Sequence, residues 1–173
     1  MSVGSARVGG RRRAAARLAA VQALYDAEMS GASVDSVIRD FTEHRVGGVA
    51  LLDHPDGGAE VEKRLADADA ILFASLVRAA AVRQDEIDAM IDAALTGEWS
   101  TDRLEAVLRA TLRAAVGELL EHPDVPPKVT IAEFVEVARA FYAGSEPGLV
   151  NAVLDRIARA LRPEAFEDGE HTR

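Results

Sequence analysis

Five arginines lie within the first 17 residues of the chain, and this segment contains no acidic residue. They are Arg7, Arg11, Arg12, Arg13 and Arg17. The rest of the chain carries 15 of the 20 basic side chains and all 29 acidic ones. A basic end on an acidic body favours local contact with nucleic acid, because clustered cations attract phosphates regardless of base sequence. A solvated basic tail is the alternative that charge alone leaves open.

Helix electrostatics give these arginines little structural purpose. A cation at a helix N-terminus faces the positive end of the helix dipole, at a cost of roughly a few tenths of a kcal/mol each. An acid three or four residues further on would offset this cost, but the first acid in the sequence is Asp26. The cluster is therefore better explained by an external anion than by folding.

Two aromatic residues stand near candidate binding positions. Tyr25 follows Arg17 by eight residues, so both share one face of a helix. Its ring would suit stacking on an unpaired base while arginines hold the phosphates. A half-buried tyrosine with its hydroxyl at the rim is the other interpretation, and both stay open here. Trp99 precedes a helix and is expected to be a packing residue rather than a ligand platform.

Residues suited to catalysis or metal binding are present without the spacing that such sites need. The histidines are His44, His54, His122 and His171. They fall at expected helix ends, in loops or in the C-terminal tail, and none has metal-ligand spacing. Asp85, Asp88 and Asp92 share a helical face, which on an acidic protein is expected to be solvated. We therefore predict no catalytic residue, no metal site and no cofactor, and a protein that is not an enzyme.

Composition narrows the class of protein further. The chain has 173 residues, of which 49% are hydrophobic and only 5% aromatic, which favours one helical domain with a real core. It has no cysteine, so disulfides and thiolate chemistry are excluded. No apolar run approaches the ~18 residues of a membrane span, and no signal-peptide pattern is found. We expect a soluble, cytoplasmic protein with no membrane partner.

Apolar residues recur at helical spacing in about seven segments, and no alternating strand pattern is found, so the predicted fold class is all-α. The segments are about 11–30, 33–41, 59–82, 85–95, 102–121, 130–141 and 145–161. Ser33 is expected to cap the second segment, with Gly31 ending the first. Asp102 with Glu105, and Thr130 with Glu133, resemble capping boxes.

The expected domain organisation is one helical domain between two flexible tails. The tails are residues 1–10 and 163–173, and the domain is 11–162. A Gly- and Pro-rich loop at about 45–58 is the clearest break and the first candidate for a boundary between lobes. Taking the helices together, we assign the N-terminal lobe to about 11–82 and the C-terminal lobe to about 83–162.

Three sequence blocks, in this order, resemble the bacterial transcription antitermination factor family NusB. Arg17–Tyr25 (RLAAVQALY) is similar to the family's R-x-x-A-x-Q-x-L-Y opening. Glu98–Leu119 is similar to its W…ILR-A-x-x-E-L helix. The third block combines Pro127–Phe141, like P-x-K-V-x-I-N-E-x-V-E-L-A-K-x-F, with Val150–Ala158, like V-N-G-V-L-D-x-I-A. Together they cover almost the whole chain.

The resemblance implies an all-helical, non-enzymatic protein of two small bundles. It implies binding of boxA RNA together with NusE, a small-subunit ribosomal protein, within an RNA polymerase antitermination complex. The RNA-binding residues that it implies are Arg11, Arg12, Arg13, Arg17, Tyr25 and Lys128. Of the four arginines, only Arg17 occupies a matched motif position. Lys128 matches the P-x-K position, and Tyr25 would lie near the RNA or NusE.

Several positions depart from the family pattern. Ala132 replaces the usual Asn, Leu149 the Phe, Ala152 the Gly and Gly117 the Tyr. Leu149 could not stack on a base as a phenylalanine would. These departures motivate an alternative: a helical protein-interaction module that has lost or masks RNA binding, for example as a homodimer. Asn151 is expected to form a structural hydrogen bond. An RNA methyltransferase carrying such a domain is set aside, because no α/β domain follows.

Overall fold

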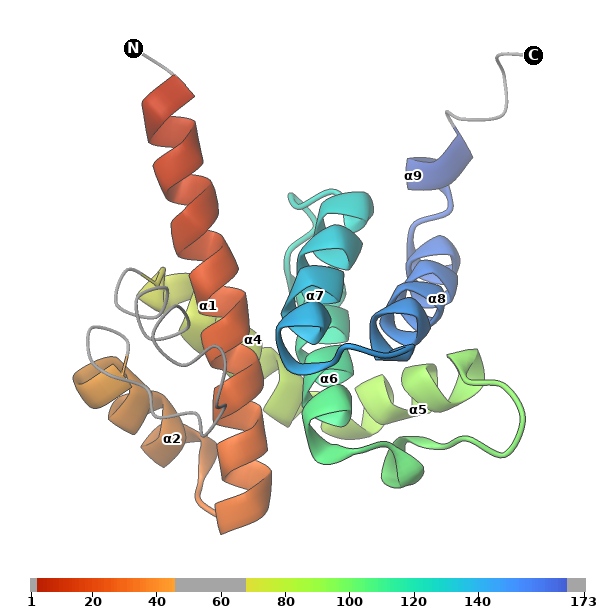
Figure 1. Cartoon of the computed structure of the whole chain (residues 1–173), viewed down its shortest axis with the longest axis horizontal. Coiled ribbons are helices and arrows are strands. Elements are labelled where there is room, and N and C mark those ends of the chain that lie inside the picture. The colour runs from red at the N-terminus through yellow and green to blue at the C-terminus, as the bar shows by residue number, and fades with distance from the viewer. Residues whose placement is uncertain (1–2, 46–67, 168–173) are drawn as a thin grey trace. The chain divides into compact units, whose positions relative to one another are not determined.

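The computed structural model describes residues 3–45 and 68–167, and every regular element within these ranges is a helix (Figure 1). The predicted all-α class is confirmed. The chain divides into two compact units, Met1–Ala81 and Val82–Arg173. None of the described helices is long and apolar enough to cross a membrane.

The first unit is organised around a long N-terminal helix. It contains α1 (Val3–Ser30), α2 (Val34–Asp40), a π-helical turn at Phe41–Arg45, and nearly all of α4 (Ala70–Val82). Residues 15–23 of α1 are all buried, and most of them are alanine. The rings of Phe41 and Phe73 stack with their centroids 5.6 Å apart. A helix buried on all sides can pack closely because its side chains are small.

The C-terminal end of α1 follows the prediction, but its beginning does not. Gly31 ends the helix with φ of 69°, and the Ser33 side chain accepts a 3.2 Å hydrogen bond from the Ser36 N–H as predicted. The helix begins at Val3 rather than at about Arg11, so that boundary was wrong. Each of the two glycines at 9–10 costs about 1 kcal/mol relative to Ala, but a glycine does not break a helix that continues on both sides.

The second unit is a bundle of four longer helices with two short ones. These are α5 (Gln84–Ala94), a 3₁₀ turn (Thr101–Arg103), α6 (Ala106–Glu121), α7 (Pro127–Phe141), α8 (Glu146–Leu161) and α9 (Glu164–Glu167). Helices α6, α7 and α8 pack on one another, and α5 packs on α6 and α8. The core holds Ile87, Ile91, Leu112, Phe134 and Leu154, all essentially inaccessible to water.

Two arginines link the helices of this unit. Arg113 on α6 forms a bidentate ion pair with Asp88 on α5, at 2.8 and 2.7 Å. Arg162, directly after α8, donates to the carbonyl oxygens of Leu119 and His122 at the end of α6 and of Val125 beyond it. The last carbonyls of a helix lack intrahelical partners, so this guanidinium satisfies them and fixes the end of α8.

Both predicted capping boxes were wrong. Asp102 lies in the 3₁₀ turn, and α6 starts later, at Ala106, with no side-chain cap. The 3₁₀ turn begins at Thr101, whose N–H and hydroxyl both donate hydrogen bonds of 2.6 Å to Asp92 Oδ1. Thr130 lies inside α7, because Pro127 already starts that helix with a preset φ. The helix therefore starts at the proline and not after the threonine that the capping-box pattern had indicated.

Other boundaries also differ from the sequence prediction. Residues 164–167 form α9, whereas the sequence predicted a tail without structure from 163. Ile71, an apolar residue in the first turn of α4, is 85% exposed. Residues 46–67 lie outside the described part of the chain, and they include the predicted loop at 45–58 from its second residue on and the predicted start of a helix at about 59. The final six residues of the predicted tail, 168–173, also lie outside it.

Candidate nucleic-acid interface

Helix α1 presents a row of cations along its first four turns. Arg7, Arg11 and Arg12 are exposed, and Arg13 is half-buried. Arg7 and Arg11 are four residues apart and therefore lie one above the other on the same face. No acidic residue occurs in this stretch of the helix. This basic edge of α1 thus has Arg7 and Arg11 on one face, with Arg12 and Arg13 projecting in other directions around the helix.

The backbone of this basic segment is held by the beginning of α4. The Asp69 N–H donates a 3.0 Å hydrogen bond to the Arg12 carbonyl oxygen. The Asp69 carboxylate in turn accepts from the N–H groups of Ile71 and Leu72, at 3.1 and 3.0 Å, and caps α4. Asp69 therefore joins the two helices while the Arg12 side chain stays in solvent.

Arg17 is buried, with only 3% of its surface exposed. It belongs to the stretch of α1 that is enclosed on all sides, so it does not extend the exposed row of arginines. Its guanidinium is therefore enclosed in this conformation, and the RNA contact that the resemblance implies for Arg17 stays a prediction. The alanines on both sides of Arg17 were the sequence signal for this burial, since small residues on every face indicate an enclosed helix.

The other candidate residues are distributed between the two units. Tyr25 is half-buried near the end of α1, which agrees with the second interpretation of this residue and leaves stacking untested. Lys128, at the second position of α7, is exposed and belongs to the other unit. Its ammonium faces the Phe166 ring, 5.8 Å from the centroid. Trp99 is 58% exposed, which does not fit the packing role expected for it.

Several other cations of the second unit pair with carboxylates, and others donate to backbone carbonyl oxygens. Arg83 pairs with Glu86 at 2.8 Å and with Glu121 at 2.7 Å. These hydrogen bonds raise the pKa of Arg83 and lower the pKa of Glu86 below its usual value. Arg139 pairs with Glu136 in the same way. Such pairs neutralise charge locally, so a phosphate has less to attract it to this surface than to α1.

The departures from the family pattern fall at positions of different exposure. Ala132 is exposed on α7, several residues inside the helix, so it has no bearing on how the helix begins. Gly117 is buried in α6, and Leu149 and Ala152 are half-buried on α8. Asn151 is exposed, and its predicted structural hydrogen bond stays a prediction.

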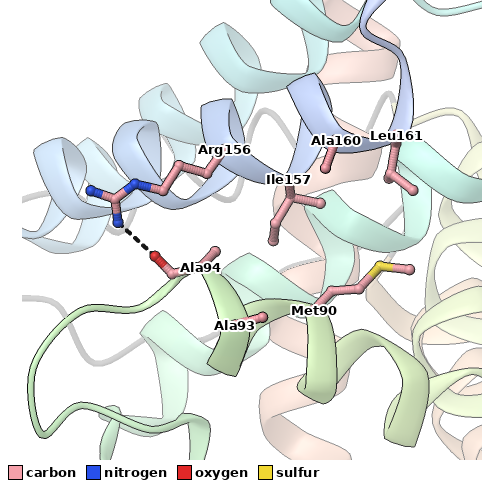
Figure 2. Close-up of a pocket in the computed structure, with 7 residues that line it drawn as sticks. All are labelled: Met90, Ala93, Ala94, Arg156, Ile157, Ala160 and Leu161. Atoms are coloured by element: carbon pink, nitrogen blue, oxygen red, sulfur yellow. Dashed lines mark hydrogen bonds between the residues drawn. The ribbon is translucent and has the colours of Figure 1, made fainter.

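An apolar pocket of about 270 Å³ lies between α5 and α8 (Figure 2). Its lining residues are Met90, Ala93, Ala94, Arg156, Ile157, Ala160 and Leu161. Arg156 lies across one end, where its guanidinium donates a 2.6 Å hydrogen bond to the Ala94 carbonyl oxygen. The lining offers neither a nucleophile nor a general base. In the described part of the chain, no group of three or more His, Asp and Glu side chains is arranged to hold a metal ion.

Fold and charge together define an all-helical protein of two compact units whose first helix carries an exposed basic edge. The NusB family model matches residues 14–159. The chain belongs to the NusB family. It is 49% identical to the transcription antitermination protein NusB of Rhodospirillum rubrum, covering 91% of this chain and 89% of the relative. The corresponding protein of Maricaulis maris is 45% identical, with 90% and 91% covered.

Solved structures agree with this assignment. Thermotoga maritima NusB superimposes with a TM-score of 0.64 at 29% identity, covering 91% of this chain and 96% of that one. A NusB chain from the crystal structure of antitermination factors NusB and NusE in complex with double-stranded RNA gives 0.63 at 25% identity, covering 87% and 98%. The family resemblance expected from the three sequence blocks is confirmed.

Proposed function

We propose that this chain is a non-catalytic transcription antitermination factor. In this proposal it binds a boxA-type single-stranded RNA together with the ribosomal protein NusE, as part of an RNA polymerase complex in the cytoplasm. The observation that carries the proposal is membership of the NusB family over nearly the whole chain. A related structure that holds NusB, NusE and RNA together supports the choice of partners.

The exposed arginines of α1 are the proposed phosphate-binding residues. Arg11 and Arg12 are exposed and Arg13 is half-buried, so all three can pair with backbone phosphates. Lys128 is the proposed second contact, and Tyr25 remains a candidate for contact with a base or with NusE. Arg17 supports α1 from inside rather than touching RNA.

The net charge of −9 determines how RNA would approach. An acidic body repels RNA over much of its surface and so favours binding at the basic edge of α1 and at the exposed Lys128. A basic ribosomal protein would neutralise part of the acidic surface and strengthen RNA binding. We therefore expect modest affinity for RNA alone and higher affinity in the presence of NusE.

A helical protein-interaction module without RNA binding is the second candidate. Trp99, 58% exposed in the loop before α6, is the residue that a protein partner or a second copy of the chain would cover in this candidate, since aromatic side chains are enriched at interfaces. This candidate predicts a stable complex with NusE, or a homodimer, whose affinity does not change when RNA is added.

Fluorescence anisotropy with labelled single-stranded RNA separates the two candidates. A boxA RNA and a scrambled RNA of the same composition would be titrated with the full chain, with and without NusE. Tighter binding of boxA that sharpens with NusE is the result expected for the antitermination factor. Equal, weak binding of both RNAs in both conditions would contradict it and favour the interaction module.

A further inference from the structure

Three side chains from three helices meet near the beginning of α7. The Phe166 ring of α9 lies 4.5 Å from the Arg159 guanidinium carbon at the end of α8, measured to the ring centroid. The Lys128 ammonium lies 5.8 Å from the same centroid. Both distances fall within the range of cation–π attraction. One half-buried ring therefore engages two exposed cations.

The end of α8 places this ring. Arg162 is fixed by its hydrogen bonds to the carbonyl oxygens of His122 and Val125, and Pro163 follows at once. The Phe166 N–H then donates a 3.0 Å hydrogen bond to the Pro163 carbonyl oxygen, which closes the turn of α9. With so short a connection from a fixed point, α9 remains close to Lys128 and Arg159.

The surroundings of the ring add negative charge. Asp155 pairs with Arg159 at 2.9 Å, and Glu164 and Glu167 are exposed on α9 itself. The ring face and the nearby carboxylates attract Lys128 and Arg159, the same two cations to which a phosphate would bind. An RNA backbone reaching Lys128 must therefore compete with α9.

We propose that Lys128 and Arg159 form one phosphate-binding subsite, and that α9 is an autoinhibitory segment that occupies it through Phe166. The proposal rests on the function proposed above, because it concerns the second RNA contact. RNA gains this contact only when the ring gives way. The segment thereby lowers the affinity of any RNA that engages the subsite.

The test replaces the ring in the full chain and measures RNA binding. Phe166→Leu keeps apolar bulk but removes the π face, and we expect boxA RNA to bind about twofold to fivefold tighter. The log–log salt slope should become more negative by about 0.7 if one further phosphate is engaged. Glu167→Gln should shift affinity in the same direction by less, and Asp102→Asn, an exposed acid away from α9, should leave it unchanged.

A double-mutant cycle assigns the gain to the subsite. Lys128→Ala should abolish the gain that Phe166→Leu produces, because the released cation is then missing. If wild type binds boxA but Phe166→Leu binds no tighter, or if the gain survives Lys128→Ala, this inference is overturned while the proposed function stands. If neither protein prefers boxA to scrambled RNA, both are overturned. Weaker binding by Phe166→Leu would also overturn it and assign the ring to base stacking. Circular dichroism of each variant confirms that it folds.

Discussion

The Asp69 N–H donates a 3.0 Å hydrogen bond to the Arg12 carbonyl oxygen, so the residue that caps α4 also holds the basic segment of α1. The bond uses only backbone atoms of the two residues. The Arg12 guanidinium remains exposed, and the Asp69 carboxylate remains available for capping. The contact between α1 and α4 at Arg12 and Asp69 thus leaves the Arg12 side chain available for binding, because it uses backbone atoms only.

Replacing Asp69 tests whether its carboxylate stabilises the fold by capping α4. Asp69→Ala removes the acceptor for the N–H groups of Ile71 and Leu72, and we expect a loss of about 1 kcal/mol in the free energy of unfolding. Asp69→Asn, whose side-chain oxygen still accepts, should recover most of this loss. Urea unfolding followed by circular dichroism measures both. Equal destabilisation by Asn and Ala would show that charge, rather than capping, matters here.

Removing exposed arginines of α1 tests whether they bind RNA phosphates. Arg11→Ala with Arg12→Ala should weaken binding of boxA and scrambled RNA alike, because phosphate contacts carry no base information. The log–log salt slope should become less negative by about 1.4, at 0.7 for each phosphate on a single strand. Arg139→Ala, an exposed arginine paired with Glu136, is the matched control and should leave the slope unchanged. An unchanged slope in the double variant would argue against α1 as the phosphate-binding edge.

Helical periodicity and turn residues were sufficient to predict the fold class. Ser33 caps α2 and Gly31 ends α1, as the helix-capping preferences of serine and glycine predict. The two capping boxes failed because such a rule considers four residues at a time. Pro127 already starts α7, and Thr101 bonds Asp92, which lies on the preceding helix α5. A four-residue signal therefore fails where a proline or a partner outside those four residues determines the local structure.

The candidate site shows the same limit. Charge clustering identified Arg11, Arg12 and Arg13, which are at least partly exposed, but it also included Arg17, which is buried. A motif match indicates that a residue matters in a family, not whether it faces solvent. The contact of Phe166 with Lys128 and Arg159 has no sequence signature, since it depends on how α7, α8 and α9 meet.

The burial of Arg17 predicts a stability effect rather than a direct binding effect. Arg17→Ala would leave buried polar groups unsatisfied and a gap in α1, and we expect the free energy of unfolding to fall by about 1–3 kcal/mol. At a temperature where the variant remains folded, its salt slope for RNA should equal that of wild type. Thermal unfolding and anisotropy measure the two quantities separately. A stable variant with a reduced slope would place Arg17 among the phosphate contacts after all.

The ion pair of Arg83 with Glu86 predicts a small stability effect that depends on pH. The hydrogen bond from Arg83 lowers the pKa of the Glu86 carboxyl below its ordinary value. A carboxyl whose pKa is lower in the folded state stabilises the fold above its unfolded pKa and loses this effect as pH falls through its folded pKa. Glu86→Gln should therefore lower Tm slightly at pH 7, while the difference from wild type should vanish once the pH lies below the folded pKa of Glu86, where the carboxyl is protonated in both the folded and the unfolded chain. Asp85→Asn, one position earlier on the same exposed turn, is the control for removing a charge. A Tm difference that persists at low pH would show that the Glu86 side chain contributes through packing rather than through its charge.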